Sequence, residues 1–160
     1  MCRSPIAEGI LKDLLIDEAE RISGPIPVKV MSAGTHAFDG YGASENATRV
    51  AAESGINLER HVSRLLNTAL ITQADLILTM EQNHTDFINR RWRGLTQVQE
   101  LKRFSRSDSM PKAVDIKDPI EGGLPVYRET FNEIKREIVR IAPVILELAR
   151  SKNRKDRSCC

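Results

Sequence analysis

Short apolar runs alternate with amphipathic segments along this chain, and this alternation constrains the fold more than any other feature of the sequence. The predicted strands are 28–31, 75–80 and a short one within 98–104; the predicted helices are 5–22, 44–54, 65–71, 81–92 and 127–150. Strands that alternate with helices are typical of a parallel sheet, because each crossover helix returns the chain to the same end of the sheet. We therefore predict an α/β fold, a three-layer sandwich in which helices cover both faces of a parallel sheet.

A single domain accounts for a chain of this length. The sequence has 160 residues, of which 41% are apolar, and this is enough for one hydrophobic core. We place the domain at residues 1–150. Residues 151–160 are rich in Lys and Arg and end in Cys159 and Cys160, so we predict a disordered basic tail there.

The first residues combine an arginine with a helix start. Ser4 is predicted to be the N-cap of the first helix, and Pro5 suits the first helical position because its missing N–H has no partner there. Arg3 directly precedes this start. An arginine beside the free amides of a helix N-terminus can bind an oxyanion, so Arg3 is the first candidate for a phosphate-binding residue.

Four further segments follow in order: 32–35 (Ser-Ala-Gly-Thr), 61–64 (His-Val-Ser-Arg), 74–80 and 118–119 (Asp-Pro). With Cys2-Arg3-Ser4-Pro5 ahead of them, they resemble the low-molecular-weight protein tyrosine phosphatases, whose phosphate loop reads Cys-x-Gly-Asn-x-Cys-Arg-Ser-Pro. The resemblance extends from Cys2 to about Leu148. It implies the fold of that family, which agrees with the predicted parallel sheet.

The resemblance also implies that part of the site lies outside this sequence. Met1 fills the second x of the loop pattern, so the family's nucleophilic cysteine, the first half of the phosphate loop and the first central strand are expected upstream of Met1. A central strand contributes on the order of 10 kcal/mol through burial, comparable with the total stability of a domain, about 5–15 kcal/mol. Two explanations stay open. Either the start at Met1 is misplaced within a longer protein, or the chain is a truncated, non-catalytic pseudophosphatase.

By the same resemblance, Cys2, Arg3 and Ser4 belong to the phosphate-binding loop. Arg3 is expected to hold two phosphoryl oxygens into the transition state, and Ser4 to donate a hydrogen bond to the nucleophilic thiolate. Cys2 is interpreted as a loop residue, because the motif places five residues between the nucleophile and the arginine.

The resemblance also implies a general acid and two residues that support the phosphate loop. Asp118 matches the general acid, which protonates the leaving group and then acts as a base toward water; Asp115 is the alternative. Ser32 and His61 match residues that support the phosphate loop by hydrogen-bonding its asparagine.

These assignments predict a protein phosphatase that works through a cysteinyl-phosphate, with no metal, no other cofactor and a phosphorylated protein as substrate. Phosphotyrosine is the default substrate that the resemblance implies. Residues 118–123 (Asp-Pro-Ile-Glu-Gly-Gly) lack the aromatics of typical tyrosine-specific members and are similar to bacterial members that include protein arginine phosphatases, so phosphoarginine is an alternative. Arsenate reductase, which shares the fold, is disfavoured because no cysteine lies between Cys2 and Cys159.

The composition of the chain argues against several other classes of protein. The net charge is +2 and aromatics are 4%, with no basic stripe interleaved with aromatics, so we predict no nucleic-acid partner. No apolar run reaches membrane-span length. The three cysteines form neither a disulfide framework nor a zinc-binding pattern, which favours the reducing cytoplasm. The sequence does not indicate an oligomeric state.

Overall fold

The computed structural model describes residues 2–22, 24–26, 28–106 and 115–158. Seven elements follow along the chain: α1 (Arg3–Arg21), α2 (Glu45–Ala52), α3 (Thr68–Gln73), β1 (Leu76–Thr79), α4 (Gln82–Arg91), β2 (Gln97–Glu100) and α5 (Leu124–Ser158). These confirm the predicted α/β class, a strand within 75–80 and a strand that overlaps 98–104. Four of the predicted helices agree to within a few residues at their ends, and the fifth, predicted at 127–150, extends to Ser158. Part of the long loop before α5, residues 107–114, lies outside the described residues.

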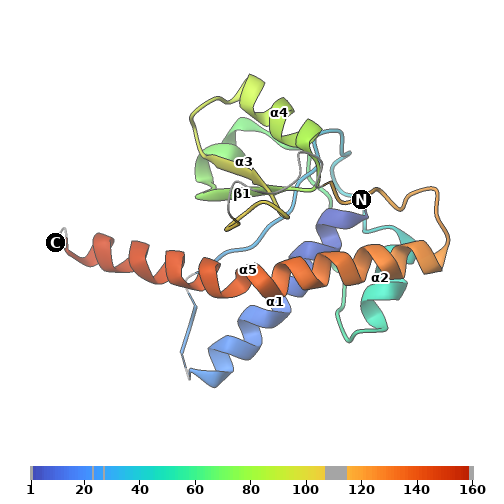
Figure 1. Cartoon of the computed structure of the whole chain (residues 1–160), viewed down its shortest axis with the longest axis horizontal. Helices are drawn as coiled ribbons and strands as arrows, with labels where there is room; N and C mark the ends of the chain where they lie inside the picture. Colours follow the sequence, from blue (N-terminus) through green and yellow to red (C-terminus); the bar gives the residue numbers. More distant parts are fainter. Residues whose placement is uncertain (1, 23, 27, 107–114, 159–160) are drawn as a thin grey trace.

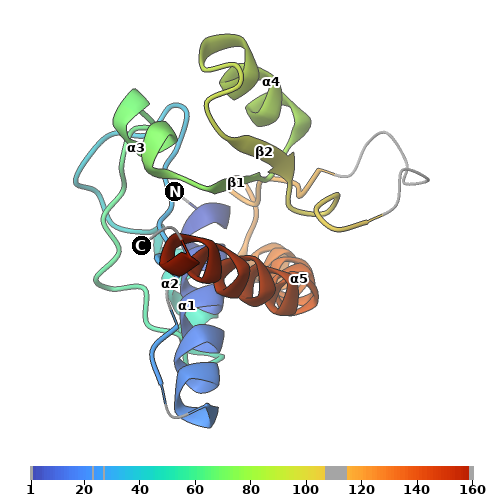
Figure 2. The same ribbon diagram turned by 90° about the vertical axis from the view of Figure 1, so that its left-hand side faces the viewer.

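A parallel sheet organises the layers. β1 and β2 pair in parallel from Leu76 opposite Gln97 to Thr79 opposite Glu100. The crossover between them is α4, as expected for parallel neighbours. Figures 1 and 2 place α4 on one side of the strands and α1 and α5 on the other, with α2 beside α1. The arrangement is the predicted one of helices on both faces of a parallel sheet.

The core lies between α1 and α5. Isoleucines at helical spacing form its centre and are 0–2% exposed: Ile6, Ile10, Ile134, Ile138 and Ile141. Gly9 allows a third segment to approach α1, because a Cβ at this position would lie 2.7 Å from the side chain of Leu58. α1 is therefore fixed on two sides, and so is the position of its first residues.

Residues 28–31 are not a strand, and this prediction is wrong. Within the described residues the sheet consists of β1 and β2, and β1 has no partner strand on its other edge. Val28 donates its N–H to Ile26 (2.8 Å), and Ser32 donates its N–H to the carboxylate of Glu8 (3.0 Å). β-propensity does not suffice here, because a strand forms when a neighbouring strand supplies hydrogen-bond partners.

The predicted start of α1 is also wrong. The helix begins at Arg3 with Cys2 as its N-cap residue, so Ser4 is the second helical residue rather than the cap. Pro5 stands in the third helical position, which it tolerates because the first four helical N–H groups have no acceptor within the helix. The contacts of the Arg3 side chain, described below, draw this residue into the first turn.

The predicted disordered tail is wrong for 151–158, because α5 continues through Ser158. Lys and Arg are good helix formers and suit a helix C-terminus. The extension is tied to the rest of the chain by ion pairs of Lys152 with Asp75 (2.6 Å) and of Arg150 with Glu18 (3.5 Å). Cys159 and Cys160 lie outside the described residues. No helix in the described parts of the chain is long and apolar enough to cross a membrane.

Candidate active site

Arg3 is the centre of a largely buried cluster of charges. Its side chain is 9% exposed and its Nη1 atom pairs with the carboxylate of Glu81. Nη1 also donates to the carbonyl oxygen of Ile116 (2.5 Å), and Nη2 lies 2.9 Å from Oδ2 of Asp118. A buried guanidinium requires such partners. The fold thus brings Arg3 and Asp118, two of the predicted site residues, into direct contact.

This cluster lies at the carboxyl end of β1. Glu81 follows the strand by two residues and is the N-cap residue of α4. The loop that carries Asp118 is attached to the same end, because the N–H of Ile116 donates to the carbonyl of Met80 (2.9 Å). Ligands of parallel α/β sheets bind beyond the carboxyl ends of the strands, and Arg3 and Asp118 lie there.

The two candidate acids have different surroundings. Asp118 is half-exposed, and its Oδ1 accepts the N–H of Ile120 (3.1 Å), which orients the carboxylate. Asp115 instead accepts the N–H of Gln82 (2.9 Å), the first residue of α4. A carboxylate at a helix N-terminus stabilises the helix. Asp115 therefore anchors α4, and Asp118 is the acid that faces Arg3.

Cys2 is packed in the interior. It is 2% exposed, and its Sγ lies 3.1 Å from the hydroxyl of Tyr127 on α5. Ser44, the N-cap residue of α2, donates its hydroxyl to the same tyrosine oxygen (3.3 Å). Burial and the contact with Cys2 raise the pKa of Tyr127. Tyr127 of α5 thus connects the start of α1 to the start of α2.

Ser32 and His61 meet at a residue that sequence reasoning missed, the buried Glu8 of α1. The carboxylate of Glu8 accepts the hydroxyl of Ser32 (2.5 Å) and pairs with Lys12 (2.5 Å). Nδ1 of His61 lies 3.5 Å from it. Burial acts to raise the pKa of Glu8, but the hydrogen bonds from Lys12 and Ser32 outweigh it, so the pKa lies below its ordinary value. An acidic residue on the apolar side of the first helix was the available signal.

The stability of the protein is expected to fall as His61 becomes protonated. Burial lowers the pKa of His61 below 6.5, although Glu8 opposes the shift. Below pH 6.5 the unfolded chain therefore binds a proton that the folded chain does not, and this contribution to stability, present above pH 6.5, is lost as the pH falls. Urea unfolding followed by Trp92 fluorescence between about pH 7.5 and 5.5 measures the loss.

The matched variants are His61→Gln, which should flatten this pH dependence, and His36→Gln, an exposed position that should retain it. His84 contributes in the same direction, because burial also lowers its pKa. If His61→Gln keeps the full slope, protonation of His61 is not the cause.

Glu81 and His84 are the other residues near the site that sequence reasoning missed. His84 stands three residues after Glu81, the N-cap residue of α4, and lies in the first turn of this helix. The charges of Glu81, Arg3, Asp115 and Asp118 all act on its imidazole. The signal available for Glu81 was its position directly after a predicted strand.

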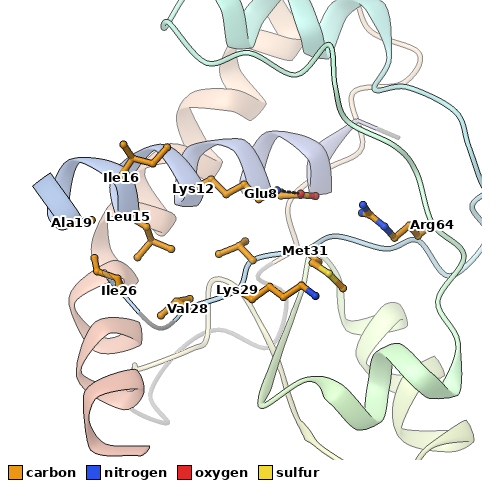
Figure 3. A pocket seen from close by; sticks show the side chains of 11 residues that line it. Glu8, Lys12, Leu15, Ile16, Ala19, Ile26, Val28, Lys29, Met31 and Arg64 are labelled. Atoms are coloured by element: carbon orange, nitrogen blue, oxygen red, sulfur yellow. Dashed lines mark hydrogen bonds and ion pairs between the residues drawn. The ribbon is translucent and has the colours of Figure 1, made fainter. Parts of the chain in front are cut away.

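A groove of about 550 Å³ runs between α1 and residues 26 and 28–31 (Figure 3). Its apolar part is formed by Leu15, Ile16, Ala19, Ile26, Val28 and Val30. Glu8, Lys12, Lys29 and Arg64 line its charged part. Nη1 of Arg64 is buried and has no hydrogen-bond partner in the described part of the chain.

Comparison with known proteins identifies the family. Residues 1–154 match the family of the low molecular weight phosphotyrosine protein phosphatases. The probable low molecular weight protein-tyrosine-phosphatase EpsP of Ralstonia nicotianae is 30% identical over 152 residues, covering 92% of this chain and 91% of that protein. The protein-arginine-phosphatase of Bacillus subtilis is 32% identical over 142 residues, covering 88% of this chain and 87% of that protein.

A solved structure agrees with these sequence matches. The YwlE arginine phosphatase from Geobacillus stearothermophilus superposes with a TM-score of 0.75 at 34% identity, covering 90% of this chain and 85% of that one. The chain belongs to the low molecular weight phosphotyrosine protein phosphatase family, as its motifs indicate. Members of this family are protein phosphatases, and the predicted fold of the family is confirmed.

Proposed function

We propose that this chain is the larger part of a polypeptide that removes phosphate from phosphorylated protein side chains, with phosphotyrosine as substrate. The observation that carries the proposal is the contact of Arg3, at the start of α1 and the carboxyl end of β1, with Asp118 at 2.9 Å. Cys2 and Ser4 flank Arg3 in the phosphate-binding segment. Ser32 and His61 support this segment through Glu8, which lies two turns into α1.

The proposed reaction has two steps. A cysteine thiolate attacks phosphorus, the bond from phosphorus to the phenolic oxygen breaks, and Asp118 gives its proton to that oxygen. Water then attacks the cysteinyl-phosphate and passes a proton to the Asp118 carboxylate, while the thiolate leaves and phosphate is released. Arg3 holds two phosphoryl oxygens in both transition states.

We assign the nucleophile to a cysteine that precedes Met1 in a longer polypeptide. Cys2 is disfavoured, because it is buried against Tyr127 and directly adjacent to Arg3. The groove beside residues 26 and 28–31 and the open edge of β1 support a strand that leads into the site from upstream. If no such segment exists, the chain is a pseudophosphatase that binds phosphorylated groups without turnover.

Phosphoarginine is the second candidate substrate. Residues 118–123 contain no aromatic side chain, and the acidic Glu121 on this loop is exposed, which suits a cationic guanidinium. Similarity to arginine phosphatases over most of the chain favours the same substrate. For either substrate the thiolate requires reducing surroundings, so we place the protein in the cytoplasm.

The test compares the 160-residue chain with an extended chain, translated in frame from the coding sequence upstream of Met1. The extended chain is expected to hydrolyse p-nitrophenyl phosphate, and the 160-residue chain is not. Phosphotyrosine and phosphoarginine peptides then decide the substrate by their kcat/KM values. Thiol-dependent turnover by the 160-residue chain that disappears in Cys2→Ser would make Cys2 the nucleophile. An inactive, folded extended chain would exclude the phosphatase function.

A further inference from the structure

Both terminal nitrogens of the Arg3 guanidinium are engaged by groups of this chain. Nη1 is taken by Glu81 and the carbonyl of Ile116, and Nη2 is taken by Asp118. The two carboxylates differ in accessibility, because the Glu81 side chain is 23% exposed and the Asp118 side chain 41%. Asp118 is therefore the partner that an anion from solvent can displace more easily.

Asp118 holds Arg3 in the way that a phosphoryl oxygen would. A carboxylate oxygen 2.9 Å from Nη2 forms a charge-assisted hydrogen bond of the kind that a phosphate oxygen forms. The carboxylate is presented on a turn, because its other oxygen accepts the N–H of Ile120 and the N–H of Gly122 donates to Pro119 (2.7 Å).

The ion pair of Asp118 with Arg3 conflicts with the role of Asp118 as a general acid. The ion pair with Arg3 uses the carboxylate form of Asp118, whereas proton donation requires the carboxylic acid, facing the leaving atom instead of Nη2. One side chain cannot meet both requirements in the same position. Asp118 must leave Arg3 before it can donate a proton.

We infer that Asp118 is a built-in competitor for Arg3, and that a tetrahedral oxyanion displaces it. The empty site is closed by the Arg3–Asp118 ion pair, while Glu81 holds Nη1 in both states. When the phosphoryl group arrives, one of its oxygens replaces Asp118 at Nη2. The released carboxylate, which is exposed to solvent, takes up a proton from water and then faces the leaving atom, so the acid is in place only when the site is occupied. The inference rests on the proposed function in one respect, the binding of the phosphoryl group at Arg3.

Calorimetric titration of the 160-residue chain with inorganic phosphate, at constant ionic strength, tests this inference. Asp118→Asn keeps an oxygen for the N–H of Ile120 but loses the ion pair. It is expected to bind phosphate about twofold to fivefold more tightly than the unchanged chain, the range that such an ion pair is worth. The control is Asp115→Asn, which removes a nearby charge without freeing Arg3 and keeps an acceptor for Gln82.

The outcomes separate the inference from the proposed function. Unchanged or weaker binding by Asp118→Asn overturns the competition, and so does an equal gain in Asp115→Asn, because the effect would then be general charge repulsion. If all three chains fail to bind phosphate, Arg3 does not hold a phosphoryl oxygen in this chain and the inference is overturned, whereas the activity of the extended chain decides the proposed function separately. Melting followed by Trp92 fluorescence shows that each variant is folded, and a variant that does not fold is replaced by Asp118→Ser.

Discussion

Replacing Arg3 with alanine in the extended chain is expected to lower kcat by about 10²–10³-fold, the usual loss when a group that stabilises the transition state is removed. The loss should be the same for every substrate, because Arg3 contacts the transferring phosphoryl group and not the leaving group. Initial rates on p-nitrophenyl phosphate and on a phosphorylated peptide measure it.

Two further variants make this result specific. Arg3→Lys keeps the charge but loses the two-pronged hydrogen bond, so it should recover part of the activity. Arg21→Ala removes an exposed arginine at the other end of α1, where it pairs with Glu18, and should leave kcat unchanged. Because Arg3→Ala leaves Glu81 without its ion-pair partner, the melting temperature of each variant is measured as well. A folded Arg3→Ala chain that loses less than about tenfold would contradict the role.

Asp118→Ala in the extended chain should slow the hydrolysis of poor leaving groups by about 10²–10⁴-fold, the reach of general acid catalysis. Activated aryl phosphates should lose less, since their leaving groups need little protonation. A series of aryl phosphates with leaving groups of increasing basicity measures this difference directly.

The matched control is Asp115→Ala, which removes the carboxylate that accepts the N–H of Gln82. It should reduce stability without making the rate depend more steeply on the leaving group. Equal, small losses from Asp118→Ala on every substrate would move the acid role elsewhere, with Asp115 as the next candidate.

Short sequence patterns predict the helices whose capping contacts lie close by in the chain. Ser44 caps α2 by accepting the N–H of Ala47, and Asn67 caps α3 in the same way through Leu70. The buried run at β1 predicts a strand because it is short and rich in β-formers. For the two helix caps the decisive contact lies within three residues of the chain, so the sequence contains it.

The failed predictions concern segments whose partners are distant. Residues 28–31 have the composition of a strand, but a ladder depends on what lies beside them. Arg3 joins α1 because Glu81 and Asp118 hold its side chain, which places the helix start before the expected cap at Ser4. The segment 151–158 is helical and extends α5, supported by the pair of Lys152 with Asp75.

For the site, the sequence indicated the family, and it predicted Arg3 and Asp118 as site residues and Ser32 and His61 as residues that support the phosphate loop. Each of these residues belongs to a short pattern with a chemical meaning. Only the tertiary structure decided that Glu8 joins Ser32 to His61, that Glu81 holds Arg3, and that Asp118 rests on the same guanidinium. From the sequence alone, a carboxylate on a helix is expected to face solvent. Whether it is instead buried beside a charged group depends on how the whole chain packs.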